Sequence, residues 1–167
     1  MSAQEENVAG KIFYTELGGP GVIMSMNFDA RFQPNTRIGF GYRIGAGFGI
    51  GQFDGKPISY NDYGGYSYYE QVTRSYYSIP VGINYIFGKP NRAPTFEVGA
   101  GATFLTRKVS LYNYEMDKPG NVVGFLTFMF RVAPVNGGIN FRAGFTPMIG
   151  TSGDLFPMAA ISLGYAF

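Results

Sequence analysis

The residues of this chain that could take part in chemistry are charged side chains set singly into apolar segments. Guanidinium groups taken out of water need carboxylates as partners. We therefore interpret the set as a structural salt-bridge network centred on Glu97 and Arg142, and a path for a solute is the alternative. Because arginine is in excess, water, backbone carbonyls or Glu16 would complete the network. The residues that share one side of an alternating pattern, and are expected to face one another, are Asp29, Arg31, Arg43, Arg74, Glu97, Arg131 and Arg142.

The groups on which most enzymes depend are missing from the sequence. It contains no His and no Cys, which removes the commonest general base and the usual ligands of transition metals. Asp54, Asp62, Asp117 and Asp154 do not have the spacing of a calcium loop. The glycines of residues 45–51 repeat every two residues, which is not the spacing of a nucleotide-binding loop. We predict no catalytic residue, no cofactor and no metal, and an enzyme that uses Ser, Asp or Tyr is the least favoured function.

The elements that must position these side chains are β-strands. Between residues 37 and 51, bulky apolar residues alternate without a break with Gly or Arg, which is the period of a strand and not of a helix. The longest apolar run is about half the roughly 20 residues that a membrane-spanning helix needs. One side of each segment is apolar, and the other carries Gly, Ser, Thr, Asn or a charge. The same alternation recurs in residues 22–32, 73–87, 95–106, 122–132, 139–146 and 161–167.

The breaks between these segments predict how the strands are connected. Short turns on one side and longer loops on the other are typical of outer-membrane barrels. A further strand over residues 12–17 and a turn at residues 18–21 bring the number of strands to eight. The alternative is one long bent strand over residues 11–32, with the missing strand in the Tyr-rich stretch 58–72. The short turns are expected at residues 33–36, 88–92 and 134–137, and the longer loops at about residues 52–71, 109–119 and 150–155.

The fold that fits these patterns is all-β: an eight-stranded antiparallel transmembrane β-barrel with up-and-down topology. Residues 11–167 would form this single domain, and residues 1–10 a flexible N-terminal segment. The apolar side would face lipid, because an Arg there at mid-depth would cost roughly 2–4 kcal/mol. A soluble lipocalin-like barrel, whose apolar side points inward, is the alternative. An interfacial girdle near the short turns favours the membrane barrel. Its aromatic residues are Phe28, Phe32, Phe40, Tyr42, Tyr85, Phe87, Phe96, Phe128, Phe130, Phe141, Tyr165 and Phe167.

Residues 161–167 resemble the terminal signal of bacterial outer-membrane proteins, with Tyr165 and Phe167 at the third-last and last positions. The resemblance covers residues 12–167. It implies a location in the outer membrane of a Gram-negative bacterium, contact with outer-membrane lipid and lipopolysaccharide, and an assembly signal at Tyr165 and Phe167 that the barrel-assembly machinery reads. It supplies no catalytic motif. The segments similar to a family of small outer-membrane barrels of unknown function, with the plan of the OmpX and OmpW types, are residues 16–19, 78–85, 97–101 and 141–147.

The predicted outer loop over residues 52–71 is rich in tyrosine, which offers an amphipathic contact surface. The net charge of +2 is small and the basic residues are scattered, so we predict no nucleic-acid partner. A closed sheet has no free edge that demands oligomerisation, so we predict a monomer. Residues 1–7 have neither a basic nor an apolar stretch, and we expect any export signal to have been removed. The alternative is that these tyrosines form only an outer girdle and a mobile loop. The expected contact residues are Tyr60, Tyr63, Tyr66, Tyr68 and Tyr69.

These observations together predict a non-enzymatic protein of the outer membrane. Its polar lumen would be plugged by side chains, because about eight strands enclose a space just wide enough for side chains to fill. Its outer loops would interact with surface partners or support the envelope. The alternative is a narrow channel or passage for small or hydrophobic solutes, similar to the OmpW type.

Overall fold

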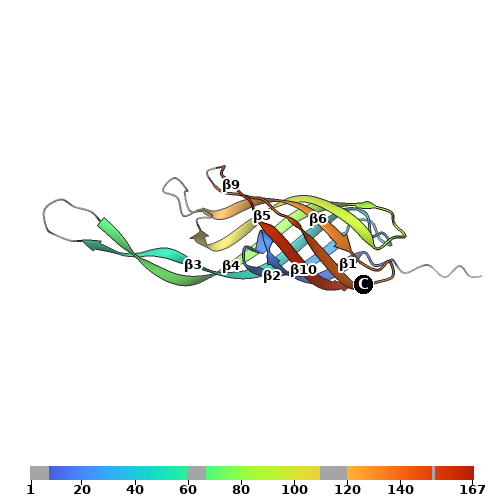
Figure 1. Cartoon of the computed structure of the whole chain (residues 1–167), viewed down its shortest axis with the longest axis horizontal. Helices are drawn as coiled ribbons and strands as arrows, with labels where there is room; N and C mark the ends of the chain where they lie inside the picture. The colour runs from blue at the N-terminus through green and yellow to red at the C-terminus, as the bar shows by residue number, and fades with distance from the viewer. Residues whose placement is uncertain (1–7, 60–66, 110–119, 152) are drawn as a thin grey trace, which may run out of the picture.

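The chain folds into an antiparallel sheet that closes on itself (Figure 1). The computed structural model describes residues 8–59, 67–109, 120–151 and 153–167. Among these residues, no helix is long and apolar enough to cross a membrane. The elements are β1 (Lys11–Gly18), the short 3-10 turn η1 (Gly19–Gly21), β2 (Met24–Arg31), β3 (Gly39–Ser59), β4 (Ser67–Gly88), β5 (Pro94–Val109), β6 (Gly120–Val132), β7 (Gly138–Phe145), β8 (Met148–Ile149), β9 (Leu155–Phe156) and β10 (Ala159–Ala166).

Eight of these strands form the barrel, and each pairs antiparallel with its neighbours. The order around the barrel is β1, β2, β3, β4, β5, β6, β7 and β10. β10 pairs with β1 from Ala166 opposite Ile12 to Ala160 opposite Gly18, which closes the sheet. β8 and β9 pair with each other and β8 also pairs with β6, so they form a small hairpin between β7 and β10. The predicted eight-stranded up-and-down barrel is confirmed.

A tight turn separates β1 from β2, so the alternative of one long bent strand over residues 11–32 is wrong. Gly18 and Gly19 have φ angles of +72° and +67°, which glycine adopts at little cost because it has no Cβ. The chain reverses at this point, and Leu17 of β1 then lies opposite Met24 of β2.

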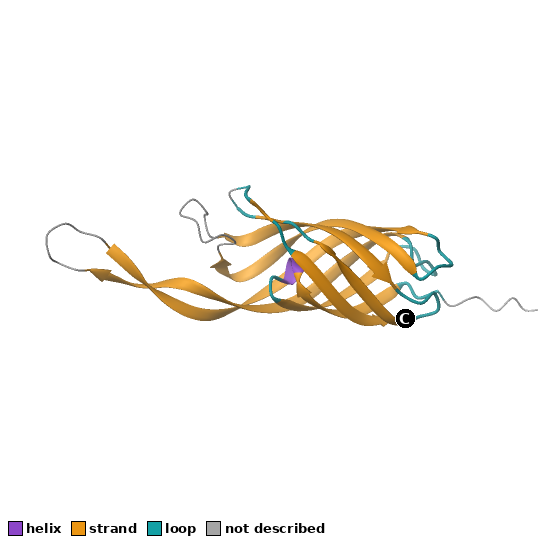
Figure 2. Cartoon of the chain, in the orientation of Figure 1, coloured by secondary structure: helices purple, strands orange, loops and turns teal. Residues whose placement is uncertain are grey.

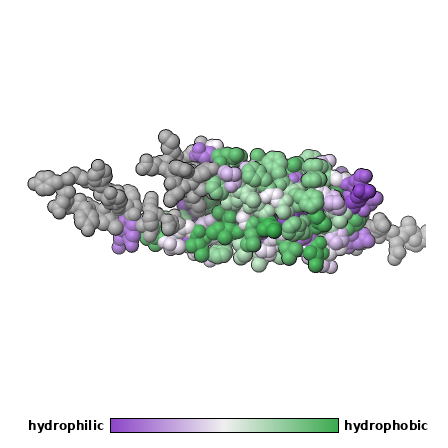
Figure 3. All heavy atoms as spheres, in the orientation of Figure 1, coloured by the Kyte–Doolittle hydropathy of each residue, from purple (hydrophilic) through white to green (hydrophobic). Residues whose placement is uncertain are grey.

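Large apolar side chains of all eight barrel strands point outward. On β4, Ile79 and Ile83 are exposed, whereas Ser78 and Asn84 are buried. Figure 3 shows apolar residues over the face of the barrel in view and hydrophilic residues at the end that carries the short turns. The lipocalin-like alternative is wrong, because the apolar side of such a barrel would line its interior.

Aromatic side chains form a row around the outside near one end of the barrel. We call this the inner end; it holds the C-terminus and the turns at residues 32–38, 89–93 and 133–137. The opposite end, with η1 and the β8–β9 hairpin, is the outer end. Aromatic rings gathered at one level are typical of the interface between lipid and water. The ring centroids in contact are those of Phe32 and Tyr42 at 5.8 Å, Phe40 and Tyr85 at 4.8 Å, Phe87 and Phe96 at 5.8 Å, and Phe96 and Phe130 at 5.4 Å.

Side chains fill the interior of the barrel in layers. Charged and amide side chains occupy the middle, and an apolar cluster occupies the part nearer the outer end. The prediction of a polar lumen is therefore corrected for the outer part, because the inward positions of β4, β5 and β6 are apolar there. We call these residues the apolar layer: Tyr76, Leu105, Val123, Phe125 and Met148.

Glycine makes room where the ring of Phe125 crosses the interior. A Cβ added to Gly101 would overlap both this ring and the carbonyl oxygen of Val81, and a packed interior has no free volume to accept it. A Cβ added to Gly124 would instead lie 3.5 Å from its nearest neighbour, Ile149. Only the first of these two glycines is required by the packing.

β3 and β4 continue beyond the barrel as a two-stranded ribbon (Figures 1 and 2). β3 runs to Ser59 and β4 begins at Ser67, although β2 pairs with β3 only as far as Phe48. The prediction of a loop over residues 52–71 is therefore wrong for most of its length. This stretch is rich in aromatic residues, which favour strands. Residues 60–66 lie outside the part of the chain that the structure describes.

The N-terminal residues Ala9 and Gly10 lie against the inner end of the barrel. The backbone N–H of Ala9 donates to the carbonyl oxygen of Val135 at 3.1 Å, and the carbonyl oxygen of Gly10 accepts from the N–H of Arg31 at 3.0 Å. The folded domain therefore begins before Lys11. The rest of the segment predicted to be flexible, up to residue 7, lies outside the described residues.

Candidate functional site: a charged interior and a basic hollow

Glu97 of β5 holds two arginines in the middle of the barrel. Its Oε1 accepts from Nη2 of Arg142 and its Oε2 accepts from Nη1 of Arg131, each at 2.7 Å. The two arginines lie directly opposite each other on β6 and β7, so their charges would repel without a shared carboxylate between them. All three side chains are buried. Glu97 therefore allows β6 and β7 to pair with two arginines buried opposite each other.

A second carboxylate, Asp29 of β2, joins this group to the inner end. It accepts from Nη2 of Arg31 at 2.5 Å and from the side-chain amide of Asn84. Arg31 also donates to the side-chain oxygen of Asn84 at 2.6 Å and to the carbonyl oxygen of Gly39 at 2.8 Å. Nη1 of Arg131 lies 3.9 Å from Oδ1 of Asp29, so the two carboxylates share one continuous network.

Arg43 of β3 extends the network toward β1. Its Nη2 donates to Oε1 of Glu16 at 2.8 Å and to the side-chain oxygen of Asn27 at 3.0 Å. The buried ring of Tyr14 lies between two guanidinium groups, with the Cζ of Arg142 at 4.3 Å and that of Arg43 at 5.6 Å from its centroid. Such cation–π contacts stabilise a guanidinium that has lost water. The predicted help from Glu16 is therefore a direct ion pair with Arg43.

Arg37, in the turn between β2 and β3, closes the inner end of the barrel. Its Nη2 donates to the carbonyl oxygens of Ala93 at 3.0 Å and Ala133 at 2.8 Å. The cavity at this end has a volume of about 10 Å³. Burial lowers the pKa of Arg37, and the charge of Arg131 lowers it further, although an arginine stays charged at neutral pH. In the alternation of residues 37–51, Arg37 lies on the same side as Arg43. The sequence could therefore have identified Arg37 as a further inward-facing arginine.

Six of the seven residues predicted for the lumen network are buried and joined in this way, and Arg74 is not. Arg74 lies on the inward side of β4 but is exposed, beyond the outer end of the barrel. The alternation gives the side of a strand on which a residue lies, but not its height along the barrel axis. The assignment of Arg74 to the lumen network is therefore corrected.

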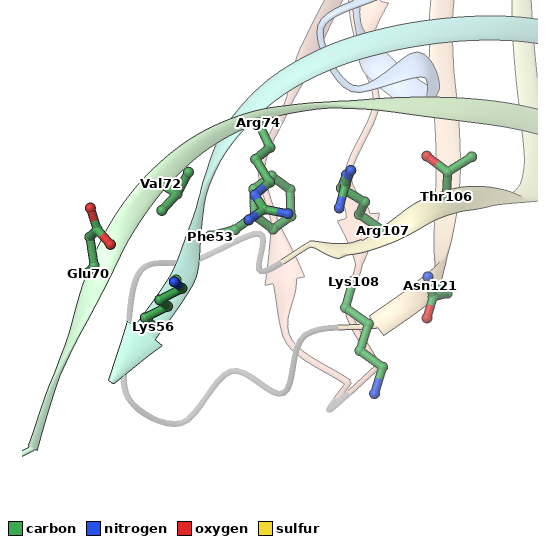
Figure 4. Close-up of a pocket in the computed structure, with 10 residues that line it drawn as sticks. Phe53, Lys56, Glu70, Val72, Arg74, Thr106, Arg107, Lys108 and Asn121 are labelled. Carbon is green, nitrogen blue, oxygen red and sulfur yellow. The ribbon is translucent and has the colours of Figure 1, made fainter. Parts of the chain in front are cut away.

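Arg74 lines a hollow of about 730 Å³ at the outer end (Figure 4). The hollow lies between the β3–β4 ribbon and the adjoining ends of β5 and β6. Phe53, one of its lining residues, also packs against the apolar layer, so the floor of the hollow is apolar. We call this the basic hollow, because four of its lining side chains are cationic and one is acidic. These charged residues are Lys56, Arg74, Arg107, Lys108 and Glu70.

Two of the five predicted contact tyrosines, Tyr68 and Tyr69, lie in the ribbon. Tyr68 and Tyr69 belong to β4, where their backbones pair with Ile58 and Pro57 of β3, and nothing further is described of their side chains. Tyr60, Tyr63 and Tyr66 lie outside the described residues. Their proposed contact with a partner therefore stays a prediction.

The aromatic residues of the predicted assembly signal lie at the inner end. Tyr165 of β10 and the terminal Phe167 both point outward and are exposed. The backbones of Phe167 and Lys11 exchange two hydrogen bonds, at 2.9 and 3.1 Å, which extends the pairing that closes the barrel.

The buried carboxylates described in the barrel interior are all hydrogen-bonded to arginines. Three buried carboxylates among the described residues, Glu16, Asp29 and Glu97, each accept a hydrogen bond from an arginine. Among the described residues, no group of three or more His, Cys, Asp or Glu could hold a metal ion.

No protein-family model matches the sequence, and no curated protein is similar to it in sequence. Among solved structures, the chain is similar to Ail, the attachment invasion locus protein of Yersinia pestis, which was solved in complex with the heparin analogue sucrose octasulfate. The similarity has a TM-score of 0.36 and 11% sequence identity, and it covers 94% of this chain and 92% of that chain.

Proposed function

We propose that this chain is an integral, non-enzymatic protein of the bacterial outer membrane, whose filled barrel anchors a surface-exposed ribbon and hollow. The observation that carries the proposal is the contrast between the two sides of the barrel wall. Apolar side chains cover the outside, while eight charged side chains are buried on the inside. Placing apolar residues outside and ion pairs inside makes sense where the surrounding solvent is lipid.

A filled lumen argues for an anchor rather than a passage. The ion network occupies the middle, the apolar layer occupies the outer part, and Arg37 closes the inner end. The competing function, a narrow passage for small or hydrophobic solutes, would require these buried side chains to move apart. Breaking buried ion pairs costs several kcal/mol, about 3–5 for one pair, so such a passage would open rarely.

The partners that fit this proposal are outer-membrane lipid and lipopolysaccharide around the apolar belt. The barrel-assembly machinery would read Tyr165 and Phe167 during biogenesis. The closed sheet of the barrel offers no free edge for pairing with a second barrel, which favours a monomer.

The proposal is tested on the full chain refolded in detergent, by gel migration with and without boiling and by single-channel recording in planar bilayers. We expect a shift of migration on boiling and no unitary conductance. Steady unitary steps would favour the passage. Folding in plain buffer without detergent would refute the membrane barrel itself.

A further inference from the structure

The basic hollow differs from the barrel interior in the way its arginines are partnered. In the interior, Arg31, Arg43, Arg131 and Arg142 each pair with a carboxylate. Among the described residues, no carboxylate lies within ion-pair distance of a cation in the hollow. Its lining residues include four cationic side chains and a single acidic one, Glu70. The side chains described for the hollow therefore carry an excess of positive charge.

Two guanidinium groups are directed into the space of the hollow. Arg74 on β4 and Arg107 on β5 lie on the inward sides of their strands, and Figure 4 shows both side chains between β4 and β5. Arg107 uses its Nε to donate to the carbonyl oxygen of Ser75 at 3.1 Å. This hydrogen bond orients the group, and its terminal nitrogens have no partner among the described residues. Two guanidinium groups facing one space, one of them oriented by a hydrogen bond, suit an oxyanion with several acceptor oxygens.

The shape of the hollow indicates the rest of the ligand. Its volume of about 730 Å³ lies within the range of roughly 300–1,000 Å³ typical of sites for small molecules. Phe53 and Val72 provide an apolar wall next to the cations, against which the face of a sugar ring can pack.

The orientation of the hollow indicates the side from which a ligand arrives. The outward sides of β4 and β5, with Tyr77 and Phe104, face the lipid belt, whereas Arg74 and Arg107 lie on the inward sides. A phosphate of a lipid headgroup would approach the outward side. A ligand that reaches both guanidinium groups must come from the aqueous space beyond the outer end.

We propose that the basic hollow binds a phosphorylated or sulfated sugar from the aqueous space, with Arg74 and Arg107 contacting its oxyanion group. The assignment rests on the proposed function, since the outer end must face the exterior. Lys56 and Lys108 add a long-range attraction that salt screens. The ribbon and the barrel would then act together as a receptor for anionic carbohydrate.

The test is calorimetric titration of glucose 1,6-bisphosphate into the full chain refolded in uncharged detergent, with glucose as the uncharged comparison. We expect saturable binding of the bisphosphate, weakened by added salt, and no binding of glucose. Substituting both Arg74→Gln and Arg107→Gln should lower the affinity by about tenfold or more, because each charge-assisted hydrogen bond contributes on that scale. The matched control is Lys89→Gln with Arg92→Gln, which removes the same charge from exposed residues at the inner end and should leave the affinity unchanged.

Two results would overturn the inference. The first is no binding of the sugar bisphosphate by the unmodified chain, including the case in which the chain binds lipopolysaccharide micelles instead. The second is an equal loss of affinity in the control variant. If the double variant does not shift on boiling, it has not folded, and the affinity of Arg74→Gln alone is measured instead. The side chain of Arg74 has no hydrogen bond or ion pair among the described residues, so this variant is expected to fold and to bind more weakly. Gel migration and conductance are measured separately, so a failure of binding is distinguishable from a failure of the membrane barrel.

Discussion

Replacing Glu97 by glutamine removes the charge that holds two buried arginines together. The side chains of Arg131 and Arg142 are 3% and 0% exposed, and each donates to a separate oxygen of Glu97 at 2.7 Å. Glutamine has nearly the same shape but only one acceptor oxygen, and its amide would point N–H groups at the other guanidinium. Glu97→Gln therefore leaves at least one buried arginine without a partner.

The energetic cost follows from the two ion pairs that this one carboxylate makes. Breaking one buried ion pair by removing a partner costs about 3–5 kcal/mol, and Glu97 serves two arginines that lie opposite each other. We expect the free energy of unfolding to fall by about 5 kcal/mol. Arg131 keeps a weaker interaction with Asp29 at 3.9 Å, which limits the loss of stability. Adding Arg142→Gln should cost less in this variant than in the unmodified chain, with a coupling of about 0.5–3 kcal/mol.

The assay is unfolding by urea in lipid vesicles, followed by far-ultraviolet circular dichroism, because the chain has no Trp. The matched control is Glu70→Gln, which makes the same chemical change at an exposed position and should alter stability by less than about 0.5 kcal/mol. A loss below about 1 kcal/mol for Glu97→Gln, or no coupling with Arg142, would refute the reasoning that the network stabilises the barrel.

Three further predictions concern the wall of the barrel and its assembly. Ile83→Arg, on the outward side of β4, should lower the free energy of unfolding in vesicles by roughly 2–4 kcal/mol, whereas Asn91→Arg in an inner turn should not; equal effects would contradict the lipid belt. Gly101→Ala should cost about 1–3 kcal/mol through overpacking, and the matched Gly124→Ala should be nearly neutral by the same urea titration. Phe167→Ala should reduce the amount of heat-shifting barrel in the outer membrane of cells but not the yield on refolding; a loss in both would place its role in stability instead.

The alternation of side chains predicts the barrel because it is a local property. The period of two already places Asp29 and Arg31 on the inward side of β2, and pairing of β2, β3 and β4 then brings Asn84 near both. The turn at Gly18 and Gly19 is also predictable, because the apolar side changes there.

Other features depend on height along the barrel axis, which the period of two does not encode. Arg74, like Arg43, lies on the inward side of its strand. It nevertheless lies beyond the end of the barrel, in the basic hollow. The apolar layer is hidden in the sequence because Tyr76 and Phe125 look like breaks in a polar side until they meet in space. The sequence of the ribbon resembles a loop because its glycines and polar residues are typical of turns. In the structure, the two halves of this stretch pair with each other as the ends of β3 and β4.

The measurement that tests the central claim most directly is collision accessibility of a spin label in lipid vesicles. The chain has no Cys, so a single cysteine can be placed at Ile79, Ile83 or Asn91 in turn. Labels at Ile79 and Ile83 should collide with oxygen, which concentrates in lipid, and hardly with a water-soluble nickel chelate, while a label at Asn91 should show the reverse. Strong collision of the nickel chelate with a label at Ile83 would contradict a barrel whose apolar side faces lipid.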